Sequence, residues 1–356
     1  MRNLALGFIG LAATAAIGWI GHSWASTANG DGNIGKATVS VTAPHRNAQL
    51  ALHLWYPAAA GGVATLVGDN PLFVGVPARL DASVAPGRHP LILLSHGSGG
   101  NAENLAWIAT PLAEAGFIVA APNHPGTTSR DSRQADTMKV WNRPRDLTAI
   151  IDALLKDPKW SGSIDPARIG ALGFSLGGET VLAAAGARLD AAAFARYCDA
   201  IKEVPGMPSD CAWLKKGGID LHAIDPVPFN AGYGDARVKA IVAVDPAGAQ
   251  AYNSASLKAI GVPVTIINLG RAATILPAIA AADVAATIPH AAYETVADAV
   301  HFSFLGTCKP GGAEMLKSEG EGDPLCTDGG GRPRTALHAE IAALIGAAFA
   351  RSLPTP

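Results

Sequence analysis

The chain has 356 residues and a formal net charge of −2, with 49% hydrophobic and only 16% charged residues. Nucleic-acid-binding domains carry a basic patch or stripe, so this nearly neutral balance gives no indication of a nucleic-acid partner. The charged fraction lies below the roughly 25% typical of soluble proteins, which makes the chain apolar without making it membrane-like throughout. A chain of this length can hold one α/β core with insertions, and we expect a single domain.

The first residues have the pattern of a targeting segment. Arg2 supplies a positive charge, residues 4–20 form an apolar stretch, and Ser23-Trp24-Ala25 matches the small-x-small end of a cleavage site. We therefore predict a signal peptide over residues 1–25, followed by a linker over residues 26–36. The alternative is an uncleaved membrane anchor, because the apolar stretch approaches the length that spans a bilayer. The first interpretation predicts a protein exported to the periplasm or the medium.

Four cysteines follow this segment, and an even number in an exported chain indicates disulfide bonds. The pairing that closes the shortest loops joins Cys198 to Cys211 and Cys308 to Cys326. Each bond would stabilise the folded state by about 3 kcal/mol. A zinc site is the alternative, but the spacing contains no C-x-x-C pair and no histidines cluster with the cysteines. We therefore expect no metal.

Strand-like and helix-like segments alternate along most of the chain, which is typical of an α/β fold with a parallel sheet. Residues 37–42 and 49–56 alternate apolar and polar side chains, as antiparallel edge strands do. Residues 58–88 form a Gly/Pro-rich connection whose course the pattern does not define. Later apolar runs predict strands at residues 91–95, 117–121, 167–172, 238–244, 262–268 and 293–296, with helices at residues 102–115, 143–155, 179–187 and 334–351.

The stretch Gly173-Phe174-Ser175-Leu176-Gly177-Gly178 follows one of these strands and precedes a helix. Strand, glycine-flanked serine and helix is the order of a nucleophile elbow, in which the serine lies on a sharp, strained turn. The flanking glycines lack a Cβ, so the strand and the helix can approach each other closely. The helix directs its free N–H groups toward the charge that forms when the serine oxygen attacks a carbonyl. Ser175 is therefore the predicted nucleophile.

A second glycine-rich turn, Ser95-His96-Gly97-Ser98-Gly99-Gly100, follows the strand at residues 91–95. A turn of this kind after an early central strand supplies the second donor of an oxyanion hole. We predict that the backbone N–H groups of Ser98 and Leu176 hold the oxyanion. Removing one such donor commonly costs about 2.7 to 4 kcal/mol of transition-state stabilisation. His96 is interpreted as a residue that braces the loop.

A serine nucleophile needs a base that takes its proton and a carboxylate that orients the base. His301 follows the last predicted strand and is preferred as the base over His290 and His338. Asp245 ends the strand after the nucleophile unit, whereas the next strand ends without a carboxylate, so Asp245 is the predicted acid. Asp298, three residues before His301, is the alternative. The carboxyl ends of parallel strands share one rim, where the three catalytic side chains should meet.

Six motifs occur in order between residues 37 and 350: Leu54-Trp55-Tyr56-Pro57, Ser95 to Gly100, Asn123-His124-Pro125-Gly126, Arg143-Pro144-Arg145-Asp146, Gly173 to Gly178, and His301-Phe302 with Phe304-Leu305. This ordered set resembles the platelet-activating factor acetylhydrolase-like and predicted dienelactone hydrolase group of α/β-hydrolases. The resemblance implies hydrolysis of carboxylic esters without a metal or organic cofactor. It also favours Asp245, because the acetylhydrolases carry their acid after the same, earlier strand. Dienelactone hydrolases use a cysteine nucleophile, and the chain departs from them at Ser175.

Residues 37–352 are accordingly expected to form one α/β-hydrolase domain, with a mostly parallel central sheet flanked by helices. The irregular stretch at residues 189–237 lies where this fold inserts a cap over its pocket. Residues 306–330 contain the second predicted disulfide loop.

The sequence therefore predicts an exported serine esterase that forms an acyl-enzyme on Ser175. Its partner would be a small-molecule ester, with membrane contact only if the N-terminal segment is retained. An amidase or an acyltransferase is the alternative within the enzyme class, because the same triad serves any acyl acceptor. A catalytically silent binding protein that kept the fold is the alternative from another class.

Overall fold

The computed structural model of the protein describes residues 33–202, 209–319 and 325–353. The strands are β1 (Ile34–Ala43), β2 (Ala48–Pro57), β3 (Val63–Val67), β4 (Val76–Leu80), β5 (His89–Ser95), β6 (Ile118–Pro122), β7 (Thr127–Thr128), β8 (Asp131–Ser132), β9 (Ile164–Phe174), β10 (Val238–Val244), β11 (Val264–Leu269) and β12 (Ala292–Val296). The α-helices are α1 (Ala106–Glu114), α2 (Gln134–Thr137), α3 (Asn142–Leu154), α4 (Leu176–Ala184), α5 (Ala191–Ala200), α6 (Asp210–Lys216), α7 (Pro226–Phe229), α8 (Ser254–Lys258), α9 (Ala282–Thr287), α10 (Gly312–Ser318) and α11 (Arg334–Ser352).

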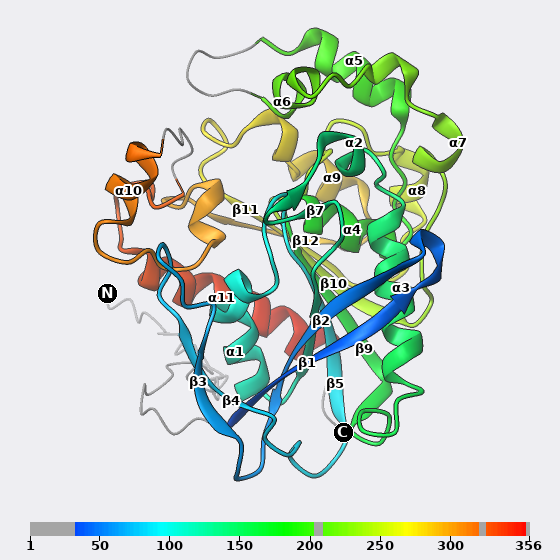
Figure 1. Ribbon diagram of the computed structural model, residues 1–356. Coiled ribbons are helices and arrows are strands. Elements are labelled where there is room, and N and C mark those ends of the chain that lie inside the picture. The colour runs from blue at the N-terminus through cyan, green and yellow to red at the C-terminus, as the bar shows by residue number, and fades with distance from the viewer. Residues whose placement is uncertain (1–32, 203–208, 320–324, 354–356) are drawn as a thin grey trace, which may run out of the picture.

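Ten of these strands form one sheet in the order β12-β11-β10-β9-β5-β6-β2-β1-β4-β3. From β12 to β6 every neighbouring pair is parallel, whereas β2 is antiparallel to both β6 and β1. Helices lie on both sides of this sheet (Figure 1). The mostly parallel central sheet with flanking helices is the fold class that the sequence predicts.

Both faces of the central strands are covered, which explains why these strands are apolar along their whole length. In β5, Leu91 and Leu93 belong to the hydrophobic core that also contains side chains of α3 and α4. Ile92 and Leu94 point to the opposite face, where they join a second core with α1 and α11. All four side chains are fully buried. The sheet thus separates two cores, and its carboxyl-terminal rim is left for the loops.

The connection over residues 58–88 contains β3 and β4, which the sequence did not reveal. Strand β4 pairs in parallel with β1, and β3 pairs antiparallel with β4 at the end of the sheet. The prediction that residues 37–42 and 49–56 form edge strands is therefore wrong, because β1 lies between β2 and β4. Strand β1 also begins at Ile34, inside the range predicted as linker. The predicted signal peptide and most of that linker lie outside the described residues.

Helices α5, α6 and α7 come from residues 189–237, the stretch predicted to form a cap. Figure 1 shows α5 and α6 above α2, in a layer separate from the helices that cover the sheet. Their apolar side chains pack in a small cluster with residues next to α2, and its buried members are Met138, Val140, Leu189, Ala191, Phe194, Leu214, Phe229 and Ala251. No helix in the described ranges is both long and apolar enough to cross a membrane.

Two disulfide bonds join segments at the periphery of the sheet. Cys198 on α5 is bonded to Cys211 on α6, and Cys308 is bonded to Cys326, across α10. These are the two pairs that close the shortest loops along the sequence. The first bond ties together two helices of the 189–237 segment, and the second ties the chain before α10 to the chain that leads into α11.

His338 on α11 supports the short helical turn at residues 301–304, whose carbonyl groups face it. Its Nε2 atom lies 3.0 Å from the carbonyl oxygens of Ser303 and Leu305. Burial, and secondarily the charge of Arg334, lower the pKa of His338 to about 4. The unfolded chain takes up this proton near pH 6.5. The contribution of His338 to stability is therefore complete above pH 6.5 and is lost as the pH falls toward 4.

We expect the free energy of unfolding to decrease from pH 7 to pH 5, with roughly 2 kcal/mol of the decrease arising from His338. The variant His338→Gln keeps a donor for the same carbonyls and should show a smaller decrease in parallel urea titrations. Equal pH dependence in the two proteins would show that another group takes up the proton.

Candidate active site

The nucleophile elbow forms where β9 passes into α4. Ser175 has φ +55° and ψ −119°, a conformation that strains any residue with a side chain. A Cβ on Gly173 would lie 1.9 Å from the carbonyl oxygen of Gly177, and a Cβ on Gly177 would lie 1.9 Å from that of Ser95. No side chain fits at either position, so glycine is required at both. The first turn of α4 therefore packs through Gly177 directly against the end of β5.

The predicted nucleophile, base and acid meet at the carboxyl-terminal rim of the sheet. Ser175 Oγ lies 3.2 Å from His301 Nε2, and His301 Nδ1 lies 2.8 Å from Asp245 Oδ2. The Asp245 side chain is completely buried, whereas that of His301 is 18% exposed. A carboxylate only accepts hydrogen bonds, so His301 carries its proton on Nδ1 and presents the Nε2 lone pair to the serine hydroxyl. The arrangement can activate Ser175 as a nucleophile.

The alternative acid and bases lie outside this hydrogen-bonded chain. Arg332 donates two hydrogen bonds of 2.7 Å to the two carboxylate oxygens of Asp298. His290 is exposed in the turn before β12, and His338 faces the carbonyls described above. In the part of the chain that the structure describes, none of these three side chains bonds to Ser175 or His301.

The acid has two further partners that the sequence analysis did not identify. Asp245 Oδ1 accepts a hydrogen bond of 2.7 Å from Asn268 Nδ2 and one of 2.9 Å from the Leu269 N–H. Both residues lie at the end of β11. The sequence did contain one signal for these partners, namely an asparagine, Asn268, within an apolar strand. A fully buried side-chain amide needs hydrogen-bond partners.

The two predicted oxyanion donors flank the nucleophile. Leu176 is the first residue of α4, and Ser98 lies exposed in the glycine-rich loop after β5. A Cβ on Gly97 would lie 3.2 Å from the Cβ of Ser175, so this loop passes beside the serine. Among the described residues, neither the Ser98 N–H nor the Leu176 N–H donates to a protein oxygen. Both groups are therefore available to an oxyanion.

The dienelactone hydrolase family model matches residues 76–204, a range that contains the glycine-rich loop and the nucleophile elbow. Over this range the chain is similar to the dienelactone hydrolases, and its fold is that of an α/β-hydrolase. This match supports a carboxylic ester hydrolase. A search of the curated proteins found no match to the chain.

Solved structures resemble this dienelactone hydrolase-like protein over most of its length. A ferulic acid esterase from Streptomyces cinnamoneus matches with a TM-score of 0.60 at 19% identity, covering 92% of each chain. A dienelactone hydrolase-like promiscuous phosphotriesterase from metagenomic libraries matches with a TM-score of 0.50 at 14% identity, covering 90% of this chain and 99% of the other. A dienelactone hydrolase from Anabaena variabilis has a TM-score of 0.48 at 16% identity, covering 89% and 98%. The first two likenesses support the shared fold.

A second Ser-His-Asp set lies beneath the glycine-rich loop of this hydrolase. Ser95 Oγ is 3.0 Å from His124 Nε2, and His124 Nδ1 is 2.7 Å from Asp146 Oδ2. All three residues are fully buried, so a substrate cannot reach Ser95. Burial lowers the pKa of His124 to about 4, which keeps this histidine neutral at physiological pH.

This buried set braces the loop together with Arg143, which is 2% exposed. Arg143 donates to the carbonyl oxygen of His96 and, at 3.3 Å, to Ser95 Oγ. Burial lowers the pKa of Arg143 to about 9, against the opposing effect of nearby carboxylates. Burial raises the pKa of Asp146, but hydrogen bonds from His124 and other groups outweigh it and lower the value to about 2. The sequence motifs at residues 123–126 and 143–146 thus meet under the glycine-rich loop.

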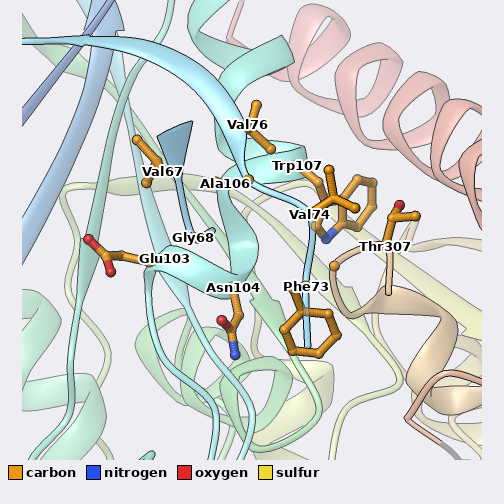
Figure 2. A pocket seen from close by; sticks show the side chains of 12 residues that line it. Val67, Gly68, Phe73, Val74, Val76, Glu103, Asn104, Ala106, Trp107 and Thr307 are labelled. Atoms are coloured by element: carbon orange, nitrogen blue, oxygen red, sulfur yellow. The ribbon is translucent and has the colours of Figure 1, made fainter. Parts of the chain in front are cut away.

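A cavity of about 100 Å³ lies beside the turn that carries His301. Figure 2 shows residues that line it, with Val67 and Val76 from the β3–β4 hairpin, Glu103 and Trp107 near the start of α1, and Thr307 beside Trp107. Trp107 Nε1 donates a hydrogen bond of 2.8 Å to the carbonyl oxygen of Phe304. The Phe304 ring stacks on Phe174, whose centroid lies 4.7 Å from that of His301. Packed aromatic rings therefore contact His301 from the side of this cavity.

No three His, Cys, Asp or Glu side chains within residues 33–202, 209–319 and 325–353 gather in a group that could hold a metal ion.

Proposed function

We propose that the protein is an exported serine hydrolase that cleaves carboxylic esters through an acyl-enzyme intermediate. The observation that carries this proposal is the hydrogen-bonded chain from Ser175 through His301 to Asp245. Beside it lie two backbone N–H groups that have no acceptor among the described residues. Nucleophilic acyl transfer by a serine requires this order of groups, in which an imidazole lies between the hydroxyl and a carboxylate. The two disulfide bonds are compatible with export, because such bonds persist in oxidising compartments.

In the first half-reaction, Ser175 Oγ attacks the ester carbonyl carbon while His301 Nε2 takes the hydroxyl proton. The carbonyl electron pair moves onto oxygen, where the N–H groups of Ser98 and Leu176 stabilise the negative charge. The intermediate collapses, the bond to the alcohol oxygen breaks, and the imidazolium gives its proton to the leaving alkoxide. Asp245 stabilises the transient imidazolium without taking its proton.

In the second half-reaction, water attacks the acyl carbon of the ester formed on Ser175, and His301 takes the proton from the water. Collapse of this second intermediate releases the carboxylic acid and returns the proton to Ser175 Oγ. We further propose that residues 189–237 act as a cap that shapes substrate access to the rim, since their helices form a layer of their own next to α2.

A fluorophosphonate probe should label Ser175 and leave Ser95 unmodified, although each serine belongs to a Ser-His-Asp set. Ser175 is partly exposed, whereas Ser95 is fully buried. Peptide mass spectrometry after labelling would identify the modified serine, and an excess of a short-chain p-nitrophenyl ester should protect it.

Two controls sharpen this labelling experiment. The Ser175→Ala variant should lose the label, and heat-unfolded protein should not react. Modification of Ser95 alone, or no modification of a folded protein, would contradict the proposed mechanism. Product analysis with a competing alcohol should yield mainly the free acid, and a predominant new ester would instead indicate an acyltransferase.

A further inference from the structure

Asn268 connects the proposed catalytic acid to two other segments of the chain, the loop at residues 279–281 and strand β12. Its Nδ2 atom donates to Asp245 Oδ1 at 2.7 Å and to the Ile279 carbonyl oxygen at 2.8 Å. Its Oδ1 atom accepts from the Ala281 N–H and from the Tyr293 hydroxyl, each at 3.0 Å. Both amide hydrogens and both oxygen lone pairs are therefore used, and the residue is fully buried.

These partners determine which end of the amide faces the acid. The Ile279 carbonyl and a carboxylate can only accept, whereas the Ala281 N–H can only donate. Exchanging the amide oxygen and nitrogen of Asn268 would set two acceptors against each other on one side and two donors on the other. Asn268 therefore donates an N–H to Asp245 regardless of the protonation of any neighbouring group.

The hydrogen bonds to Asp245 are divided between its two oxygens. Oδ1 receives the Asn268 amide and the Leu269 N–H, whereas Oδ2 receives His301 Nδ1. Rotation of the carboxylate would break both bonds at Oδ1 in a site without exposure to water. We propose, on the basis of the triad in the proposed function, that Asn268 is a positioning residue that fixes the Asp245 carboxylate in the orientation that His301 needs.

This role explains why the end of β11 carries an amide. An aspartate at residue 268 would place a second carboxylate at the 2.7 Å position of the present amide hydrogen bond. Two carboxylates this close do not both stay ionised, so they would share a proton. Tyr293, which is partly exposed, supports the arrangement because its hydroxyl donates a hydrogen bond to Asn268 Oδ1. The titratable groups that face the acid are thus His301 and Tyr293.

The test compares Asn268→Asp with wild-type protein in the hydrolysis of p-nitrophenyl acetate from pH 5 to pH 9. We expect kcat to fall roughly 10- to 100-fold at pH 7, because misplacement of catalytic groups costs on this scale. KM should change less than about twofold, and the acid limb of kcat/KM should move to higher pH as the carboxylates share a proton.

Asn253→Asp is the matched control. Asn253 caps the start of α8, and an aspartate can cap it equally well, so this variant should keep the wild-type profile.

A structural role alone would lower the thermal midpoint of Asn268→Asp and leave its kcat and pH profile unchanged, which would overturn the proposal. Tyr293→Phe decides the question if Asn268→Asp does not fold, because Tyr293 is 37% exposed and the protein should tolerate the loss of its hydroxyl. We expect Tyr293→Phe to lower kcat by about two- to fivefold at unchanged KM. A wild-type kcat would overturn the positioning role. If the triad itself were wrong, Ser175→Ala would remain active. That result is distinct from a wild-type kcat in the Asn268 and Tyr293 variants.

Discussion

Ser175→Ala should reduce kcat for ester hydrolysis by roughly 10⁶-fold, because loss of a serine nucleophile leaves only the oxyanion hole and substrate binding to act. The remaining site would still hold His301 and both oxyanion donors, so some acceleration over water should persist. Substrate affinity should change little, since the hydroxyl contributes mainly to the transition state. Initial rates with p-nitrophenyl acetate and butyrate would measure the effect.

The control for this variant is Ser40→Ala, which removes a hydroxyl from the exposed face of β1. It should hydrolyse both esters at the wild-type rate. Circular dichroism and the thermal midpoint of each variant would establish that the chain is folded. Turnover by Ser175→Ala within tenfold of wild type would exclude this serine as the nucleophile and, with it, the acyl-enzyme mechanism.

Asp245→Asn should reduce kcat by roughly 10⁴-fold, the loss seen when a triad acid becomes an amide. The physical reason lies in the hydrogen bonds around the side chain. Asn268 and the Leu269 N–H both donate to the oxygen at Oδ1, so an amide would keep its oxygen there and turn its NH2 group toward His301. His301 Nδ1 would have to accept this hydrogen bond, which moves the ring proton to Nε2 and removes the lone pair that faces Ser175.

The matched control is Asp298→Asn, because Asp298 is the alternative acid and differs from Asp245 in its partners. Its loss breaks an ion pair with Arg332 in which both side chains are partly exposed, and such pairs contribute little to stability. We expect kcat for Asp298→Asn to stay within a few-fold of wild type. A larger loss for Asp298→Asn than for Asp245→Asn would reverse the assignment of the acid.

Local sterics explain which parts of the fold could be predicted from sequence. The glycines at residues 173 and 177 could be assigned to the elbow from the sequence, because the tight turn leaves no room for a Cβ. At Gly173 it would collide with the backbone of Gly177, and at Gly177 with the backbone of Ser95 on the next strand. The central strands could be predicted from the sequence, because a strand that is buried on both faces has a continuous run of apolar residues. Strands β3 and β4 were missed because several of their side chains are exposed, including Val63 at 69% and Leu66 at 55%, so no simple alternation marks them.

The candidate site divides in the same way. Ser175, Asp245 and His301 could be named from the sequence because each follows a strand, and the carboxyl ends of parallel strands meet at one rim. The partners of the acid could not be named, because the contact between Asn268 and Asp245 depends on the register of β10 against β11 and on the loop at residues 279–281.

The sequence by itself determined the mostly parallel fold, the sharp turn at the nucleophile and the order of the candidate triad. These properties follow from burial along single strands and from steric limits at single positions. Only the tertiary structure decided which serine is accessible, since Ser95 and Ser175 both have a histidine and an aspartate in line and differ in burial. Accessibility and hydrogen-bond partners are properties of the packed molecule, because residues from different elements supply them, as Ser175 and His301 do at 126 positions apart.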